Sequence, residues 1–105
     1  MNRNELSSYL TTFLRSDDYR DDCPNGLQVA GKHEVTKIFT AVSASVELFE
    51  IAAKQKADTV IVHHGLIWNF ERPLYMGGYR ERVRILLEHN INLYGFHLPL
   101  DAHEE

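Results

Sequence analysis

The sequence predicts an α/β fold in which a layered sheet with parallel βαβ units carries packed helices, and three observations lead to it. Val60-Ile61-Val62 is an unbroken β-branched run, which is typical of a strand buried on both faces of a parallel sheet. A second apolar run, Ile38–Val42, is followed by a helical pattern before that strand begins. A further helical pattern leads to a third apolar run at Ile91–Phe96. The 105 residues support one domain, residues 1–105.

The first third of the chain predicts a helix, a loop and a short strand. Between residues 4 and 15, apolar side chains recur every three or four positions and predict one buried stripe: Leu6, Tyr9, Leu10, Phe13 and Leu14. A polar cluster at residues 16–18 ends this helix. Asn25-Gly26 is interpreted most simply as a turn before a strand at Leu27–Val29. Cys23 follows Asp22 and has no basic neighbour in sequence, so we expect an inert thiol rather than a nucleophile.

The rest of the chain alternates strands and helices. We expect a helix at about Val46–Lys56 with Ser45 as its N-cap, and another at Tyr79–Asn90 before the third parallel strand. Residues 66–78 form a long loop that contains Trp68, Phe70, Pro73, Tyr75 and Met76. Such a loop acts as a lid or packs on the edge of its own domain, and both alternatives stay open. The arginines of the helix expected at Tyr79–Asn90 are interpreted as a solvated face rather than as a clamp that binds phosphate.

Composition and charge exclude several classes of function. The chain has 44% apolar and 25% charged residues, which is ordinary for a folded domain, and no stretch approaches the ~20 apolar residues of a membrane span. Its net charge is −4 and its Lys and Arg residues are dispersed, so nucleic-acid binding is not expected. A single cysteine excludes an internal disulfide and a cysteine-rich zinc module, and the expected compartment is the cytoplasm.

Candidate metal ligands follow two neighbouring strands of the predicted sheet. His63 and His64 end one strand, and His97 and Asp101 follow the next. Because the carboxyl ends of parallel strands meet at one edge of a sheet, we expect the four side chains at one rim. Imidazole and carboxylate groups together suit divalent Zn, Mn, Fe, Ni or Co. The alternative is that one histidine of the doublet is a hydrogen-bonded core residue and the other a surface residue.

The histidine doublet favours two metal ions over one. Neighbouring side chains on a strand point to opposite faces, so His63 and His64 are expected to bind different ions, with Asp101 bridging them. Such a pair lowers the pKa of a bound water from about 16 towards 7, which favours hydrolysis. His97 leaves its strand earlier, so we rank a catalytic role as a proton shuttle, or a role beside the ligands, above direct ligation. Pro99 is expected to keep the segment after His97 extended. The remaining histidines are expected at the surface: His33, His89 and His103.

Four segments carry a resemblance to a known family. They are Asn25-Gly26-Leu27-Gln28-Val29-Ala30-Gly31, Val42-Ser43-Ala44-Ser45, Ala57-Asp58 through His63-His64-Gly65-Leu66-Ile67-Trp68, and Ile91 through His97-Leu98-Pro99-Leu100-Asp101-Ala102-His103. In register over the whole chain, they resemble the dinuclear-metal family called GTP cyclohydrolase I type 2, or Nif-three-like. The histidine doublet and the His-x-Pro-Leu-Asp segment are its most specific signals.

The resemblance implies a fold, a cofactor and an activity. It implies a Nif-three-like fold assembled into toroidal homohexamers, with His63, His64 and Asp101 as ligands of two divalent transition-metal ions. The implied function is metal-dependent hydrolysis of a small polar or nucleotide substrate. The alternative is a metal-handling or regulatory metal-binding protein without turnover.

Chain length separates this sequence from the family that it resembles. Members of that family are about twice as long, and near their C-terminus a further His and Glu complete the two-metal site. We therefore expect residues 1–105 to be the N-terminal portion of a longer protein, with an incomplete site, partial metal occupancy and no activity of its own.

Overall fold

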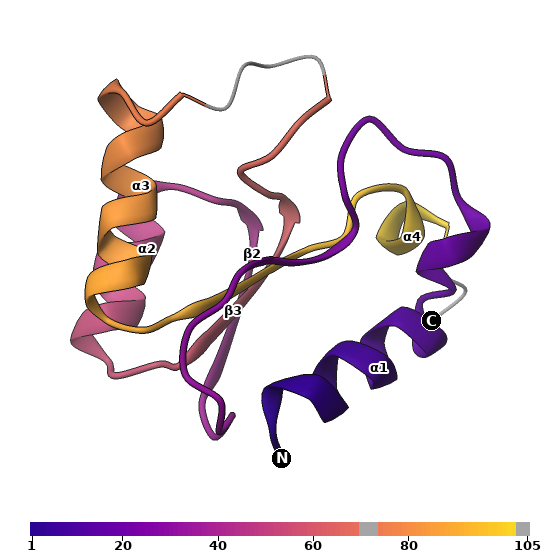
Figure 1. The fold of residues 1–105 in the computed structure, drawn as a ribbon, viewed down its shortest axis with the longest axis horizontal. Helices are drawn as coiled ribbons and strands as arrows, with labels where there is room; N and C mark the ends of the chain where they lie inside the picture. Colours follow the sequence, from indigo (N-terminus) through magenta and orange to yellow (C-terminus); the bar gives the residue numbers. More distant parts are fainter. Residues whose placement is uncertain (70–73, 103–105) are drawn as a thin grey trace.

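The computed structural model describes residues 1–69 and 74–102. Its elements are α1 (Arg3–Phe13), the 3-10 helix η1 (Ser16–Asp18), β1 (Gly26–Val29), β2 (Ile38–Ser43), α2 (Val46–Lys54), β3 (Thr59–His64), α3 (Gly77–Glu88), β4 (Asn92–Gly95) and α4 (Leu98–Asp101). The described strands form one mixed sheet in the order β1-β4-β3-β2. Figure 1 shows α2 and α3 on one side of this sheet and α1 on the other.

The parallel part of the sheet confirms the predicted βαβ units. β2 pairs with β3 through Ile38↔Thr59 and Ala41↔Val62, and β3 pairs with β4 through Val60↔Leu93. Helices α2 and α3 are the two crossovers. Ser45 caps α2 as expected, because its side chain accepts a hydrogen bond from the backbone of Leu48. Both parallel connections therefore direct the strand ends towards one rim.

β1 takes a position that the sequence pattern did not indicate. It runs antiparallel to β4, with Gly26 opposite Gly95 and Leu27 opposite Tyr94. The first residue of β1 therefore lies beside the last residue of β4. As a result, the loop that precedes β1 is brought to the same rim of the sheet as His97.

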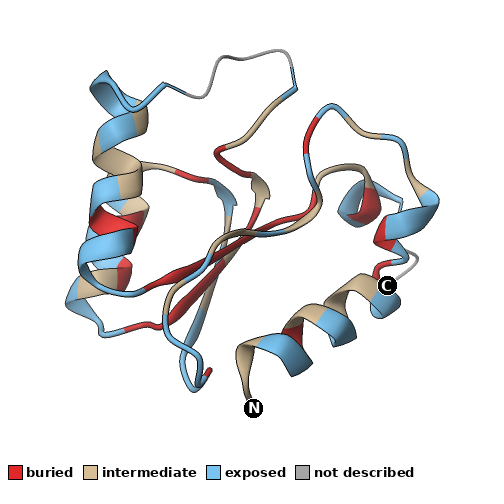
Figure 2. Ribbon diagram, in the orientation of Figure 1, coloured by how far each residue is buried: buried red, intermediate tan, exposed pale blue. Residues whose placement is uncertain are grey.

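Two apolar clusters cover the two faces of the sheet, and the buried positions lie along the strands and on the inward sides of the helices (Figure 2). The larger cluster joins α2 and α3 to β3 and β4, and its fully buried members include Phe49, Ala52, Leu86, Val60, Val62 and Leu93. The smaller cluster packs Leu6 of α1 and its C-cap residue Leu14 against Tyr94 and Phe96. The central strands are thus buried on both faces, which explains their continuous apolar runs.

The stripe of α1 is narrower than predicted. Leu6 and Leu14 are buried, whereas Tyr9 is 54% and Phe13 41% exposed. The two exposed rings stack on each other with their centroids 5.5 Å apart. Leu6, Leu10 and Leu14 form a single row at four-residue spacing, and this row packs in the apolar cluster with Tyr94 and Phe96.

Helix α3 begins at Gly77, two residues before the predicted start, where φ is +54°. Arg84 pairs with Glu81 and Glu88 at the surface, as expected for a solvated face. Arg82 differs, because its Nη1 donates to the backbone oxygen of Ala44, 3.3 Å away. Of the preceding loop, Phe70 and Pro73 lie outside the described residues.

Candidate metal centre

The histidine doublet lies at the last two positions of β3. The ring centroids of His63 and His64 are 4.4 Å apart, with an angle of 43° between the ring planes. His64 is held by the neighbouring strand end, since Ala44 N donates to its backbone oxygen (2.8 Å) and Ser43 Oγ lies 3.3 Å from its Nδ1. The two imidazoles therefore reach one local site from different directions.

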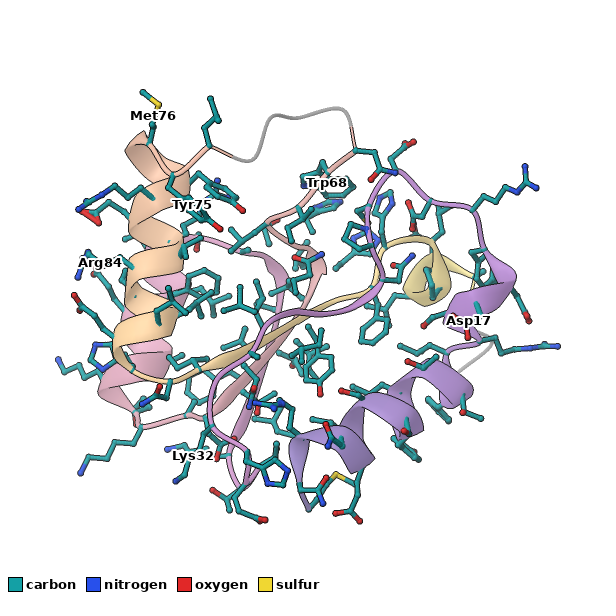
Figure 3. The ribbon with its side chains drawn as sticks, viewed as in Figure 1. Asp17, Lys32, Trp68, Tyr75, Met76 and Arg84 are labelled. Atoms are coloured by element: carbon teal, nitrogen blue, oxygen red, sulfur yellow. The ribbon has the colours of Figure 1, made fainter. Side chains whose placement is uncertain are left out.

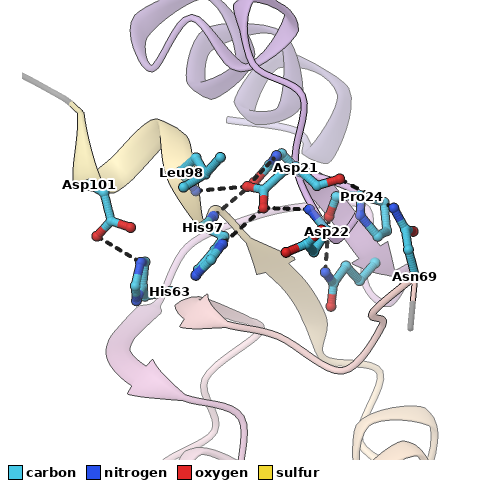
Figure 4. Close-up of polar contacts among 10 residues, drawn as sticks. Asp21, Asp22, Pro24, His63, Asn69, His97, Leu98 and Asp101 are labelled. Atoms are coloured by element: carbon cyan, nitrogen blue, oxygen red, sulfur yellow. Dashed lines mark hydrogen bonds and ion pairs between the residues drawn. The ribbon is translucent and has the colours of Figure 1, made fainter. Parts of the chain in front are cut away.

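Asp101 comes to this site from α4. The segment after His97 was expected to be extended, but Leu98 is the first residue of α4, with Pro99 in its first turn. Proline is tolerated there because the first N–H groups of a helix need no partner within that helix. This single turn brings Asp101 Oδ1 to 3.0 Å from His63 Nε2 (Figure 4).

The contact between His63 and Asp101 is not a hydrogen bond. His63 Nε2 is buried, and among the described residues no hydrogen-bond partner meets it in suitable geometry. A buried nitrogen of this kind normally has a partner, because leaving it unpaired costs about 1–3 kcal/mol. A nitrogen and a carboxylate oxygen about 3 Å apart are instead spaced as two ligands of one ion with bonds of about 2 Å would be. The donor set therefore fits a divalent transition metal.

His97 joins the doublet from the end of β4. Its ring centroid lies 4.8 Å from that of His63 and 5.5 Å from that of His64. One nitrogen from each of the three rings can be chosen so that all lie within 4.8 Å of one another. The four predicted residues thus do lie at one rim, although Asp101 contacts His63 rather than both members of the doublet.

Sequence reasoning missed two residues that hold His97 in place. Asp21 Oδ1 lies 2.9 Å from His97 Nδ1, and Asp21 Oδ2 accepts a hydrogen bond from Leu98 N at 2.8 Å. Asn25 accepts a hydrogen bond from His97 N (2.8 Å) and donates one to Asp21 (3.1 Å). We call Asp21 and Asn25 the His97 brace. No local signal marks them, because their partner is more than 70 positions away.

Hydrogen bonds keep the carboxylate of Asp21 ionised. Burial acts to raise the pKa of Asp21, but hydrogen bonds from Leu98 N, His97, Asn25 and Asp22 N outweigh it and lower the pKa to about 2. Cys23 nearby is buried, and burial together with the charges of Asp21 and Asp22 raises the pKa of its thiol to about 11. A protonated thiol is a poor nucleophile, in agreement with the expectation of an inert cysteine.

An aromatic residue borders the histidines. Trp68 lies near the start of the long loop, and its ring meets that of His97 edge-on at 5.1 Å and that of His64 at 6.0 Å. Tyr75 and Met76 are instead exposed near the start of α3 (Figure 3). Part of the loop therefore borders the site, as a lid would, and part projects elsewhere.

The other histidines lie apart from this site or outside the description. His33 and His89 are exposed, as expected. His103 lies outside the described residues.

None of the helices in residues 1–69 and 74–102 has both the length and the apolar composition that a membrane crossing requires.

Known proteins resemble this chain over its whole length. The GTP cyclohydrolase 1 type 2 homologs of Haemophilus influenzae and Escherichia coli K12 are 49% and 50% identical to it over 105 residues. The solved structure of protein ybgI, described as of unknown function, is 50% identical and superposes with a TM-score of 0.97, covering 100% of this chain and 42% of that one. For TTHA1606 from Thermus thermophilus, the identity is 46%, the TM-score 0.95 and the coverage 100% and 43%.

These comparisons confirm the Nif-three-like fold. The chain spans 42% of the length of both curated relatives, so the properties of the whole proteins are not thereby those of residues 1–105. The profile of one family matches all of residues 1–105. The chain belongs to the Duf34/NIF3 (NGG1p interacting factor 3) family.

Proposed function

We propose that this chain contributes His63, His64 and Asp101 to a site for two divalent transition-metal ions in a hydrolase. The observation that carries the proposal is the buried His63 Nε2, which lies 3.0 Å from Asp101 Oδ1 without a hydrogen bond. His64 adds a second imidazole beside it. Two imidazoles and a carboxylate form a ligand set for Zn, Mn, Fe, Ni or Co rather than for Ca or Mg alone.

Exposure on the Asp101 side favours catalysis over a purely structural site. The Asp101 side chain is 55% exposed and that of His63 is 22% exposed. Structural metal sites are closed by protein ligands, whereas catalytic sites keep a position open to water and substrate. A divalent metal held here supplies Lewis acidity and a source of nucleophilic water near neutral pH. The alternative, a metal-handling or regulatory protein, predicts metal binding without turnover.

His97 is the residue that we propose to move the proton. Its ring lies beside both histidines of the doublet, and Asp21 occupies its Nδ1, so Nε2 is the nitrogen available to a reacting water. Histidine is the side chain that most often accepts and returns a proton in enzyme catalysis. This assignment leaves coordination to the other three residues.

A nucleotide is the substrate class that we propose. The curated relatives carry the name GTP cyclohydrolase 1 type 2 homolog. Trp68 provides an aromatic surface next to His97 and His64, suited to a planar base. By the same family relationship, we propose that the complete protein works in the cytoplasm as a homohexamer.

Calorimetric titration of the metal-free chain with Zn²⁺ or Mn²⁺ tests the ligand assignment. We expect His64→Ala and Asp101→Ala each to weaken binding at least about tenfold, because each removes one of few ligands. His89→Ala is the matched control, since this histidine is exposed and lies on the α3 side of the molecule. Wild-type affinity in both ligand variants would exclude the proposed site.

Turnover separates the two functional alternatives. A full-length relative loaded with the preferred metal should hydrolyse a nucleotide, with GTP as the first compound to assay, and His97→Gln should lower kcat more than metal affinity. Tight metal binding with no turnover on any nucleotide would instead favour metal handling.

A further inference from the structure

We propose that Asp21 is a positioning residue that fixes the tautomer of His97, so that its Nε2 lone pair faces the histidine doublet. Asp21 lies in the loop before β1, and no role follows for it from the sequence. Its side chain is only 2% exposed. The consequence for chemistry rests on the function proposed above, but the tautomer itself does not.

The hydrogen bonds of Asp21 leave only one arrangement of the proton. Its two oxygens accept from three other donors: Leu98 N at 2.8 Å, Asn25 Nδ2 at 3.1 Å and Asp22 N at 2.7 Å. An ionised carboxylate has no proton to donate, so the 2.9 Å contact with His97 requires a proton on Nδ1. In neutral imidazole, the other nitrogen is then bare. Nε2 of His97 is therefore an acceptor.

The position of the ring shows where that acceptor points. In Figure 4, the His97 ring lies between Asp21 on one side and His63 on the other. Its centroid is 4.8 Å from that of His63 and 5.5 Å from that of His64. Since Nδ1 faces Asp21, Nε2 is on the edge of the ring turned to the doublet. A carboxylate behind a histidine is a common way to fix its orientation and raise its basicity.

The backbone of His97 is fixed by the same loop. Asn25 Oδ1 accepts from His97 N at 2.8 Å, and Leu98 N donates to Asp21. The ring and the two adjacent peptide groups are thus held from one side. The antiparallel pairing of β1 with β4 makes this possible, because it places Gly26 opposite Gly95.

A second metal site is the competing interpretation of the same residues. Asp21, Cys23 and His97 each offer a ligand atom within 4.8 Å of the others. Both oxygens of Asp21 are already occupied by donors, however, and a metal ligand must be a thiolate rather than the protonated thiol of buried Cys23. A metal there would have to break the bonds that hold His97. We therefore assign the cluster to positioning.

Imidazole ¹⁵N spectroscopy of the metal-free, uniformly labelled chain tests the proposal, with spectra recorded at rising pH until the imidazole signals no longer change. We expect a proton on Nδ1 of His97 and none on its Nε2, with His97→Gln identifying the signals. In Asp21→Asn, this pattern should give way to the Nε2-protonated form or to a mixture of the two. Asp22→Asn is the matched control, because Asp22 is the adjacent exposed carboxylate and only its backbone N–H contacts Asp21.

The outcomes are distinct. A wild-type spectrum with His97 protonated on Nε2 overturns the proposal, whether or not any variant folds. So does an Asp21→Asn spectrum in which His97 keeps its wild-type pattern. A wild-type circular dichroism spectrum and a cooperative urea unfolding transition in Asp21→Asn show that the fold is intact. A failed metal titration of His64→Ala and Asp101→Ala would remove the proposed function but leave the tautomer result standing.

Discussion

Gly65→Ala tests how β1 holds the turn that follows the histidine doublet. The side chain of Gln28, on β1, accepts a hydrogen bond from Leu66 N (2.8 Å) and donates one to Pro24 O (3.1 Å). A Cβ at residue 65 would lie 2.7 Å from both Cδ and Nε2 of Gln28, closer than real Cβ contacts allow. Gln28 must therefore move, and both hydrogen bonds break.

The expected loss of unfolding free energy depends on the two backbone groups that lose their hydrogen-bond partner. Leu66 is 3% exposed, so its N–H loses its acceptor in a buried place, at about 1–3 kcal/mol. The hydrogen bond to Pro24 O is exposed, and water replaces it at about 0.5 kcal/mol. We expect Gly65→Ala to lower the free energy of unfolding by about 2–3 kcal/mol in total.

Urea unfolding followed by circular dichroism measures this cost in a double-mutant cycle. Gln28→Ala alone should cost about 2 kcal/mol, because Leu66 N again lacks its acceptor. In the double variant, the new methyl group occupies space that Gln28 has left, so the cost should be about that of Gln28→Ala alone. Gly78→Ala is the control, since a Cβ there meets nothing within 4 Å. Costs that add within about 0.5 kcal/mol would refute the steric argument.

Three further predictions concern stability. The pKa of Asp21 falls from 3.8 to about 2 on folding, so its contribution of about 2 kcal/mol is present above pH 4 and lost as pH falls towards 2. The difference in unfolding free energy between wild type and Asp21→Asn should shrink by that amount over this range, and a constant difference would contradict it. Asn92→Leu should cost about 3 kcal/mol by urea unfolding, because buried Asn92 accepts from Gly31 N and donates to Lys32 O, and a cost near zero would show that water replaces both. Ser45→Ala should cost about 1 kcal/mol through the loss of the α2 cap, whereas Ser45→Gly should cost only a few tenths.

Much of the fold could be predicted from local patterns, because a parallel strand that is buried on both faces consists of a continuous apolar run. In β3, Val60 and Val62 are fully buried on one face of the sheet. On the other face, Ile61 packs against the smaller apolar cluster. A strand of this kind shows an apolar run whatever its neighbours are. β1 carries no such information, because a short strand with one exposed side chain, Leu27, fits either direction and either edge. Its place depends on β4, which is distant in sequence.

In the candidate site too, the residues that follow parallel strands could be predicted and those placed by the antiparallel strand could not. His63, His64, His97 and Asp101 follow parallel strands, and the rule that parallel strand ends share a rim was enough to bring them together. Asp21 and Asn25 reach that rim through an antiparallel neighbour, so no spacing rule connects them to His97. The turn of α4 escapes prediction because a proline after Leu98 favours extended backbone there, although the first turn of a helix tolerates proline.

The order of the strands in the sequence limits the order in which the parts of this site can form. β4 is the last of the described strands to be synthesised, yet it lies between β1 and β3 and supplies the pairing partner of β1. During translation, β2, α2 and β3 can associate before β4 is synthesised. At that stage, β1 has no strand to pair with. The contact from Asp21 to His97 requires β4, which precedes His97 and pairs with β1, so we expect this contact to form after the local β2-α2-β3 unit.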